Sequence, residues 1–288
     1  HLRQVTDDRR GFHLEAGACF TVQLLGFEPQ GLDCTLGILD RISDCLDVLH
    51  VNLSCGELVN GIGAKPLGHG PHGAGEVTLV HAIQADPVAA IGAKLEAFNW
   101  GVVPYVKPGA NLALRVRDVV ENGCDVIVLG NHGVIVAADT VGAADDLLHR
   151  VFAALRMDAA PLLEATLDDL PEGWTAGPAS LSHVARDPAL LSMATGGSLY
   201  PDHVIFCGVG VLACDGPPEG DSPPFVLIPG KGAAMRKDAS AGAWALAQCL
   251  GDVLMRVPVQ AELNYLTLQQ NGELLDWDAE KYRRALNG

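Results

Sequence analysis

The sequence is poor in aromatic and basic residues, and the shortage of basic residues limits which partners the chain can bind. Aromatic side chains make up 5% of the 288 residues, and 19 Lys and Arg face 35 Asp and Glu, for a net charge of −16. Nucleic acids and anionic membranes are bound by basic surfaces, so this balance argues against both as partners. A phosphorylated small-molecule substrate stays compatible, because a local basic pocket can exist in an acidic protein.

The sequence also lacks the patterns of a disulfide framework or a membrane span. It has 8 cysteines, but none forms a C-x-x-C pair, and their spread suggests reduced thiols in a cytoplasmic protein. No apolar run reaches the roughly 18 residues of a membrane span, and no signal peptide is visible. The chain starts at His1 rather than Met, so we expect the true N-terminus to be missing or processed.

The composition favours a layered α/β protein. The hydrophobic fraction is 49%, rich in Ala, Gly, Val and Leu, which is ample for one large domain or two modest ones. An acidic, Pro- and Gly-rich segment at 160–182 indicates the boundary between a core domain and a C-terminal extension. We therefore predict a core domain over residues 1–160 and a C-terminal α/β extension over 161–288.

One stretch, residues 125–137, combines two apolar runs with a polar break. Val126 to Leu129 and Val134 to Val136 predict strands buried on both faces. The break, Gly130 to Gly133, predicts a tight turn, because Gly and Asn permit positive φ. It places His132 at the end of two rigid strands, where a neutral imidazole is a good metal ligand. The alternative is a core or turn histidine with a satisfied hydrogen bond.

The apolar patterns predict further elements along the chain. We expect helices near 36–49, 88–98, 110–122, 183–193 and 278–286, one from Asp139 or Thr140 to about 158, and one from Asp238 to Pro258. We expect strands at 102–106, 204–206 and 225–228. If residues 77–81 form a strand, its alternation puts Val77, Leu79 and His81 on one face. His203 then stands at the entry to a strand.

The run GNHGVIVAADT from Gly130, followed by an Ala-rich amphipathic helix, resembles the class II aldolase/adducin family. Three further stretches are similar to its sugar-phosphate-aldolase-like branch with a long C-terminal extension: residues 99–114, 200–206 and 229–258. The tail from Trp277 to Arg283 adds to the resemblance, which covers about residues 77–288. The resemblance implies a three-layer αβα fold around a mostly antiparallel central sheet, and a homo-oligomer, commonly a tetramer with active sites between subunits.

The resemblance also implies a divalent metal, usually Zn²⁺, held by three histidines. The histidine of the Asn-His-Gly motif corresponds to His132. Residues 76–91 resemble the family's strand that carries a His-x-His pair, followed by a helix. His81 fits the second position of the pair, whereas Leu79 occupies the first. Catalytic zinc usually takes three protein ligands and keeps an open position, so a further donor is needed. His69, His72 and Glu76 are the candidates, ahead of His50 and His149.

The resemblance further implies an acid/base group and residues that bind the substrate. The family's acid/base glutamate has no clear counterpart, and Glu57 and Glu76 are the candidates, of which we take Glu76 as the catalytic one. Asn131 and Lys107 are candidate substrate-binding residues, with a solvated lysine as the alternative for Lys107. Residues 52–56 are the stretch most similar to the family's Gly-rich phosphate-binding turn.

Two functions of different classes follow, and a third possibility concerns residues 1–76. The first is a metal-dependent aldehyde-lyase that cleaves a sugar phosphate or related hydroxy-carbonyl compound by a retro-aldol reaction, with the metal as Lewis acid and a carboxylate moving the proton. The second is a non-catalytic, adducin-like oligomerisation or binding module with a degenerate metal site. The third possibility is that residues 1–76 are not the family's native N-terminal part, because of truncation or a sequence disruption.

Overall fold

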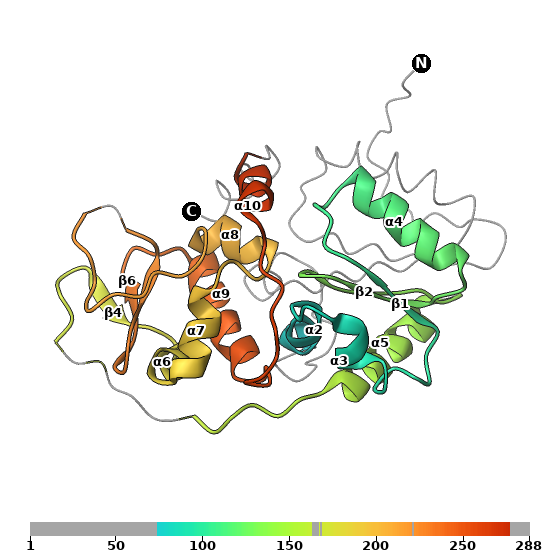
Figure 1. Ribbon diagram of the computed structural model, residues 1–288, viewed down its shortest axis with the longest axis horizontal. Coiled ribbons are helices and arrows are strands. Elements are labelled where there is room, and N and C mark those ends of the chain that lie inside the picture. Colours follow the sequence, from blue (N-terminus) through green and yellow to red (C-terminus); the bar gives the residue numbers. More distant parts are fainter. Residues whose placement is uncertain (1–73, 163–166, 168, 221, 277–288) are drawn as a thin grey trace, which may run out of the picture.

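The computed structural model describes residues 74–162, 167, 169–220 and 222–276. Within them the chain is a mixed α/β protein, with two three-stranded sheets packed against helices (Figure 1). The α/β class predicted from the sequence is confirmed at this level. The predicted elements at 36–49 and 278–286 lie outside the described residues.

The first sheet has the order β1-β2-β3 and contains the predicted hairpin. Strand β1 (Trp100–Val103) pairs in parallel with β2 (Val126–Leu129), and β2 pairs antiparallel with β3 (Gly133–Val136). Every residue of β2 and β3 is buried. The two strands predicted from continuous β-branched runs are thus confirmed, and such runs are typical of strands covered on both faces.

Helices cover both faces of this sheet. Side chains alternate along β2, so Ile127 packs with α4 (Ala110–Glu121) while Val128 packs with α5 (Val141–Leu155) on the other face. Helix α5 begins as predicted, with Thr140 Oγ1 accepting a hydrogen bond from Ala143 N at 3.1 Å. The short helix α3 (Pro87–Ile91) packs on the same side as α5 through Ile91.

The second sheet lies in the C-terminal half and has the order β4-β6-β5, with both pairs antiparallel. Its strands are β4 (Trp174–Ala176), β5 (Phe225–Ile228) and β6 (Gly232–Arg236). Helices α6 (Ala179–Arg186) and α9 (Ala241–Leu254) pack together beside it, and α7 (Pro188–Thr195) contacts both helices. Helix α10 (Leu268–Leu275) packs on α8 (Pro201–Cys207).

Helix α2 (Ala74–Ala82) lies between the two halves of the described chain (Figure 1). It contacts β3 and α5 on one side and α9 on the other. Leu79 and Val80 belong to the hydrophobic cluster of the C-terminal half, whereas Ala82 belongs to that of α5. The proposed boundary near residue 160 therefore stays a prediction, because one helix contributes to both cores.

Two strands predicted from the sequence are helices in the structure. Residues 77–81 belong to α2, and residues 204–206 belong to α8. Thr78 to Ile83 are all buried, so no polar face reveals the helical period, and a short apolar run reads equally well as a strand. Helix α8 begins with Pro201 at its first position, which suits a helix start although the β-branched residues behind it favour a strand.

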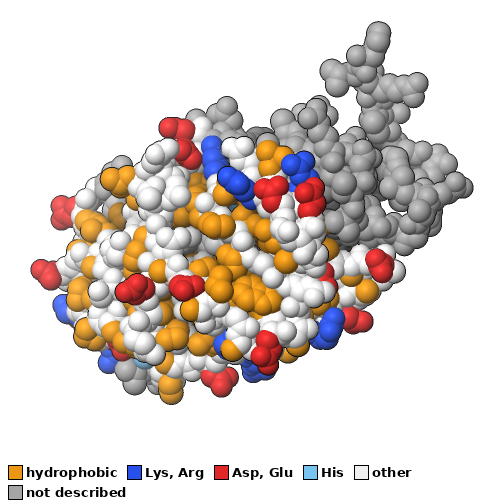
Figure 2. Space-filling view, turned by 45° about the vertical axis from the view of Figure 1, so that its right-hand side comes forward, with side chains coloured by type: hydrophobic (Ala, Val, Ile, Leu, Met, Phe, Trp, Pro, Cys, Tyr) orange, Lys and Arg blue, Asp and Glu red, His pale blue; other side chains and the backbone are white. Residues whose placement is uncertain are grey.

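No helix of the described residues is long and apolar enough to cross a bilayer. The thiols of Cys124, Cys207 and Cys214 are free, whereas Cys249 is disulfide-bonded, so the expectation of reduced cysteines is wrong for Cys249. On the face shown in Figure 2, acidic side chains are spread among apolar ones and basic side chains are fewer.

Candidate functional site

The turn between β2 and β3 has a tightly determined backbone. Gly130 N donates to Val103 O at 2.8 Å, and His132 N donates to Leu129 O at 3.1 Å. A Cβ on Gly130 would lie 2.8 Å from Tyr105 N, so only glycine fits beside the chain that follows β1. Asn131 has φ 56°, a left-handed conformation that asparagine tolerates better than most residues.

The Asn131 side chain is buried and ties the turn to distant parts of the chain. Its Nδ2 donates to Leu199 O at 2.8 Å and to Asn264 O at 2.6 Å, and its Oδ1 accepts from Asn264 Nδ2 at 2.8 Å. The Asn131 backbone N donates to Ala82 O at 2.8 Å. Both amide donors and one acceptor position are thus used within the protein, and the side chain is 0% exposed. These contacts make Asn131 part of the framework of the turn.

His132 follows directly and is half-buried, at the point where the two buried strands meet. The rigid backbone on either side limits the directions that its imidazole can take. The predicted placement of His132 at the end of the hairpin is therefore confirmed, while its role as a metal ligand stays a prediction.

His81 lies on α2, in the core. Its Nε2 donates to the backbone carbonyl of Leu155 at 2.9 Å, and its Nδ1 is buried with no hydrogen-bond partner among the described residues. Burial, above all, lowers the pKa of His81, although the bond to Leu155 opposes this and Lys94 adds to it. The imidazole is therefore neutral near pH 7, with a lone pair on Nδ1.

The predicted pairing of positions 79 and 81 on one face is wrong. Successive residues of an α-helix turn by about 100°, so side chains two positions apart diverge by roughly 200°. Leu79 accordingly packs with the C-terminal cluster, while His81 reaches the end of α5. The loss of a histidine at position 79 therefore does not remove a neighbour of His81.

The described residues do not by themselves complete a metal site. They contain no group of three or more His, Cys, Asp and Glu side chains placed to hold an ion. The candidate donors His50, His69 and His72, the carboxylate of Glu57 and the stretch 52–56 lie outside the described residues. Glu76 is in α2, with its side chain outside the description, so its catalytic role stays a prediction.

Two other candidate residues, Lys107 and His149, lie on different elements of the fold. Lys107 is half-buried in the loop between β1 and α4, and its role toward substrate stays a prediction. His149 is exposed on α5, where its Nδ1 donates to Asp145 O at 2.8 Å.

His203 is not at a strand entry, as the sequence predicted, but within helix α8, where it is 1% exposed. Its Nε2 donates to Gly210 O at 3.1 Å, and its Nδ1 has no partner among the described residues. The ring lies 5.7 Å from that of Tyr200 and 6.4 Å from that of Phe225, measured between centroids. Burial lowers the pKa of His203 to about 4.

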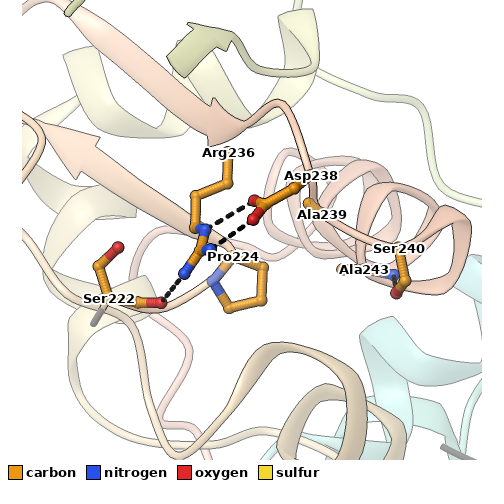
Figure 3. Close-up of a pocket in the computed structure, with 7 residues that line it drawn as sticks. All are labelled: Ser222, Pro224, Arg236, Asp238, Ala239, Ser240 and Ala243. Carbon is orange, nitrogen blue, oxygen red and sulfur yellow. Dashed lines mark hydrogen bonds and ion pairs between the residues drawn. The ribbon is translucent and has the colours of Figure 1, made fainter. Parts of the chain in front are cut away.

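A shallow hollow of about 170 Å³ lies between the end of β6 and the start of α9 (Figure 3). Among the described residues that line it, the cation is Arg236. Its guanidinium donates to both carboxylate oxygens of Asp238 and, at 3.2 Å, to Ser222 O. The Arg236 guanidinium lowers the pKa of Asp238, so the two charges offset each other. None of the predicted site residues lines this hollow.

Comparison with known protein families, with curated proteins and with solved structures finds no match to this chain. The resemblance carried by the Asn-His-Gly motif therefore stays a prediction.

Proposed function

We propose that the chain is a metal-dependent lyase of the class II aldolase type, which cleaves a sugar phosphate or related hydroxy-carbonyl compound in the cytoplasm. We further propose that its complete fold is the three-layer αβα arrangement of that family, assembled as a homo-oligomer. The observation that supports this most is His132, presented at the end of two buried strands by a turn that Asn131 ties down.

We propose His132 as a ligand of a divalent metal, with zinc as the first metal to test. His81 is a second candidate, because its Nε2 is bonded to a backbone carbonyl and its Nδ1 lone pair is left over. Metal-binding histidines commonly show this arrangement, in which the second ring nitrogen donates to a carbonyl or carboxylate. The further ligands must come from outside the described residues or from another subunit.

A second function, a non-catalytic binding or oligomerisation module, is favoured by the same bond of His81. A neutral histidine that donates to Leu155 O inside the core is accounted for by packing alone. In that case His81→Gln lowers the free energy of unfolding, by about 1–3 kcal/mol for the lost buried contact, and leaves metal content unchanged. Light scattering after size-exclusion chromatography would then give the molar mass of the oligomer that such a module forms.

The metal content of the purified protein separates the two functions. We expect about one divalent ion per chain in the wild type, since catalytic zinc sites hold a single ion on three protein ligands. We expect His132→Ala to lose it, because alanine cannot bind a metal and the site is then left with too few protein ligands. Elemental mass spectrometry on both proteins, after dialysis against zinc, gives the ratio.

His149→Ala is the matched control, because His149 is exposed on α5 and bonds only within its own helix among the described residues. It should keep the metal. If the wild type takes up no zinc, the proposal of a lyase is rejected and the binding module remains as the proposed function. If zinc is bound, an aldol-cleavage screen with sugar phosphates is the next measurement, with His132→Ala as its inactive reference.

A further inference from the structure

The C-terminal segment 262–266 reaches back across the chain to the hairpin turn. Asn264 and Asn131 form a reciprocal amide contact, in which Asn131 Nδ2 donates to Asn264 O at 2.6 Å and Asn264 Nδ2 donates to Asn131 Oδ1 at 2.8 Å. The two residues are 133 positions apart. The contact is thus a long-range cross-link between the turn and the segment.

The same segment is also fixed to the residues directly after α2 and to the loop before α8. Asn264 N donates to Ile83 O at 2.7 Å, Ala85 N donates to Glu262 O at 2.8 Å, and Leu266 N donates to Ser198 O at 2.8 Å. Gln84 and Leu263 form an antiparallel bridge. These backbone bonds hold the Asn264 side chain at a defined place over the turn.

From these contacts we infer that Asn264 is a positioning residue for His132, the metal ligand of the proposed function on which this inference rests. Asn131 is buried and in the left-handed region at φ 56°, a conformation that has to be held by its surroundings. Two of the hydrogen bonds that hold the Asn131 side chain are made to Asn264. A change at Asn264 therefore alters the turn that carries His132, without touching His132 itself.

Asn264 is suited to a test because it is exposed, so a substitution there leaves no cavity in the core. Asn264→Asp keeps the size of the side chain but replaces the donor by an oxygen, which then faces Asn131 Oδ1, acceptor against acceptor. The backbone bonds of Asn264 are unaffected by the change. The neighbouring Tyr265→Phe is the matched control, since it removes only the bond from Tyr265 Oη to Met193 O, 2.9 Å, away from the turn.

The experiment measures two quantities on the full chain: the dissociation constant of Zn²⁺ by competition with a chromophoric chelator, and hydrogen exchange at the backbone amide of His132. For Asn264→Asp we expect the zinc dissociation constant to rise about tenfold, as for lost outer-shell support of a metal ligand. We expect His132 exchange to speed up by about the same factor, through local opening of the turn. Both quantities should stay at wild-type values in Tyr265→Phe.

Equal changes in the two variants would mean that the substitution at Asn264 acts only through general stability, and would overturn the inference. No change in Asn264→Asp would overturn it as well. A wild type that binds no zinc would reject the proposed function separately. The exchange at His132 would then decide alone: faster exchange only in Asn264→Asp keeps Asn264 as the residue that holds the turn, and unchanged exchange rejects it.

Discussion

Gly251→Ala is expected to destabilise the protein by about 2–3 kcal/mol, the cost of overpacking a well-packed interior. Gly251 is buried in α9 where this helix crosses α6. A Cβ there would lie 2.7 Å from the backbone carbon of Ser180 and 2.5 Å from its Oγ, and would also meet Leu181 N. Backbone atoms cannot rotate away as a side chain can, so the two helices must separate.

Gly272→Ala supplies the control for the same substitution in another helix. Gly272 lies inside α10, and a Cβ there would meet none of the described residues within 4 Å. Alanine should therefore stabilise the protein by about 0.5–1 kcal/mol through its better helix propensity. Urea unfolding of the three proteins checks both signs, and a Gly251→Ala protein as stable as Gly272→Ala would contradict the close helix contact.

Stability is also expected to fall as the pH is lowered from about 6.5 to about 4, because of His203. Its pKa is lowered from 6.5 to about 4 by burial in the folded protein. Below pH 6.5 the unfolded chain binds a proton that the folded chain does not, so protonation favours unfolding until the pH passes the folded value. The full difference corresponds to about 3 kcal/mol.

His203→Gln tests this effect, because glutamine can still donate to Gly210 O but does not titrate. The wild type should lose about 3 kcal/mol more than the variant between pH 7 and pH 4. The difference between the two curves is the relevant quantity, since His81, whose pKa burial also lowers, acts in the same direction in both. Parallel curves for wild type and His203→Gln would rule out a neutral buried His203.

The parts of the fold that the sequence predicted well are those that local chemistry decides. Asn131 between two glycine-flanked β-branched runs indicates a hairpin, and Thr140 before an apolar stripe indicates the start of α5, and both are present. The helices α2 and α8 were missed because their surroundings bury the α2 side chains from Thr78 to Ala82 and nearly all those of α8, and a buried run has no polar face from which to read its period.

The site was harder to predict because its supporting contacts are not local. The motif indicated His132, but nothing near residue 131 points to Asn264, and Asn264 lies in a segment without regular periodicity. A reciprocal amide contact between two asparagines also has no sequence spacing of its own. Such partners become visible only when the chain is folded, which is why Asn131 was expected to meet substrate rather than Asn264 and Leu199.

The bond between positions 131 and 264 bears on how the protein is made. During synthesis the β2–β3 hairpin leaves the ribosome well before the segment that completes it, so the bonds between Asn131 and Asn264 cannot form until more than a hundred further residues have been made. Until then Asn131 Oδ1 is satisfied by solvent, and the turn is held by its local contacts and by the bonds of Asn131 to Ala82 O and Leu199 O. A ribosome stalled shortly before codon 264 would therefore carry a chain whose first sheet is assembled but whose turn is still open, and release of the full chain would close it.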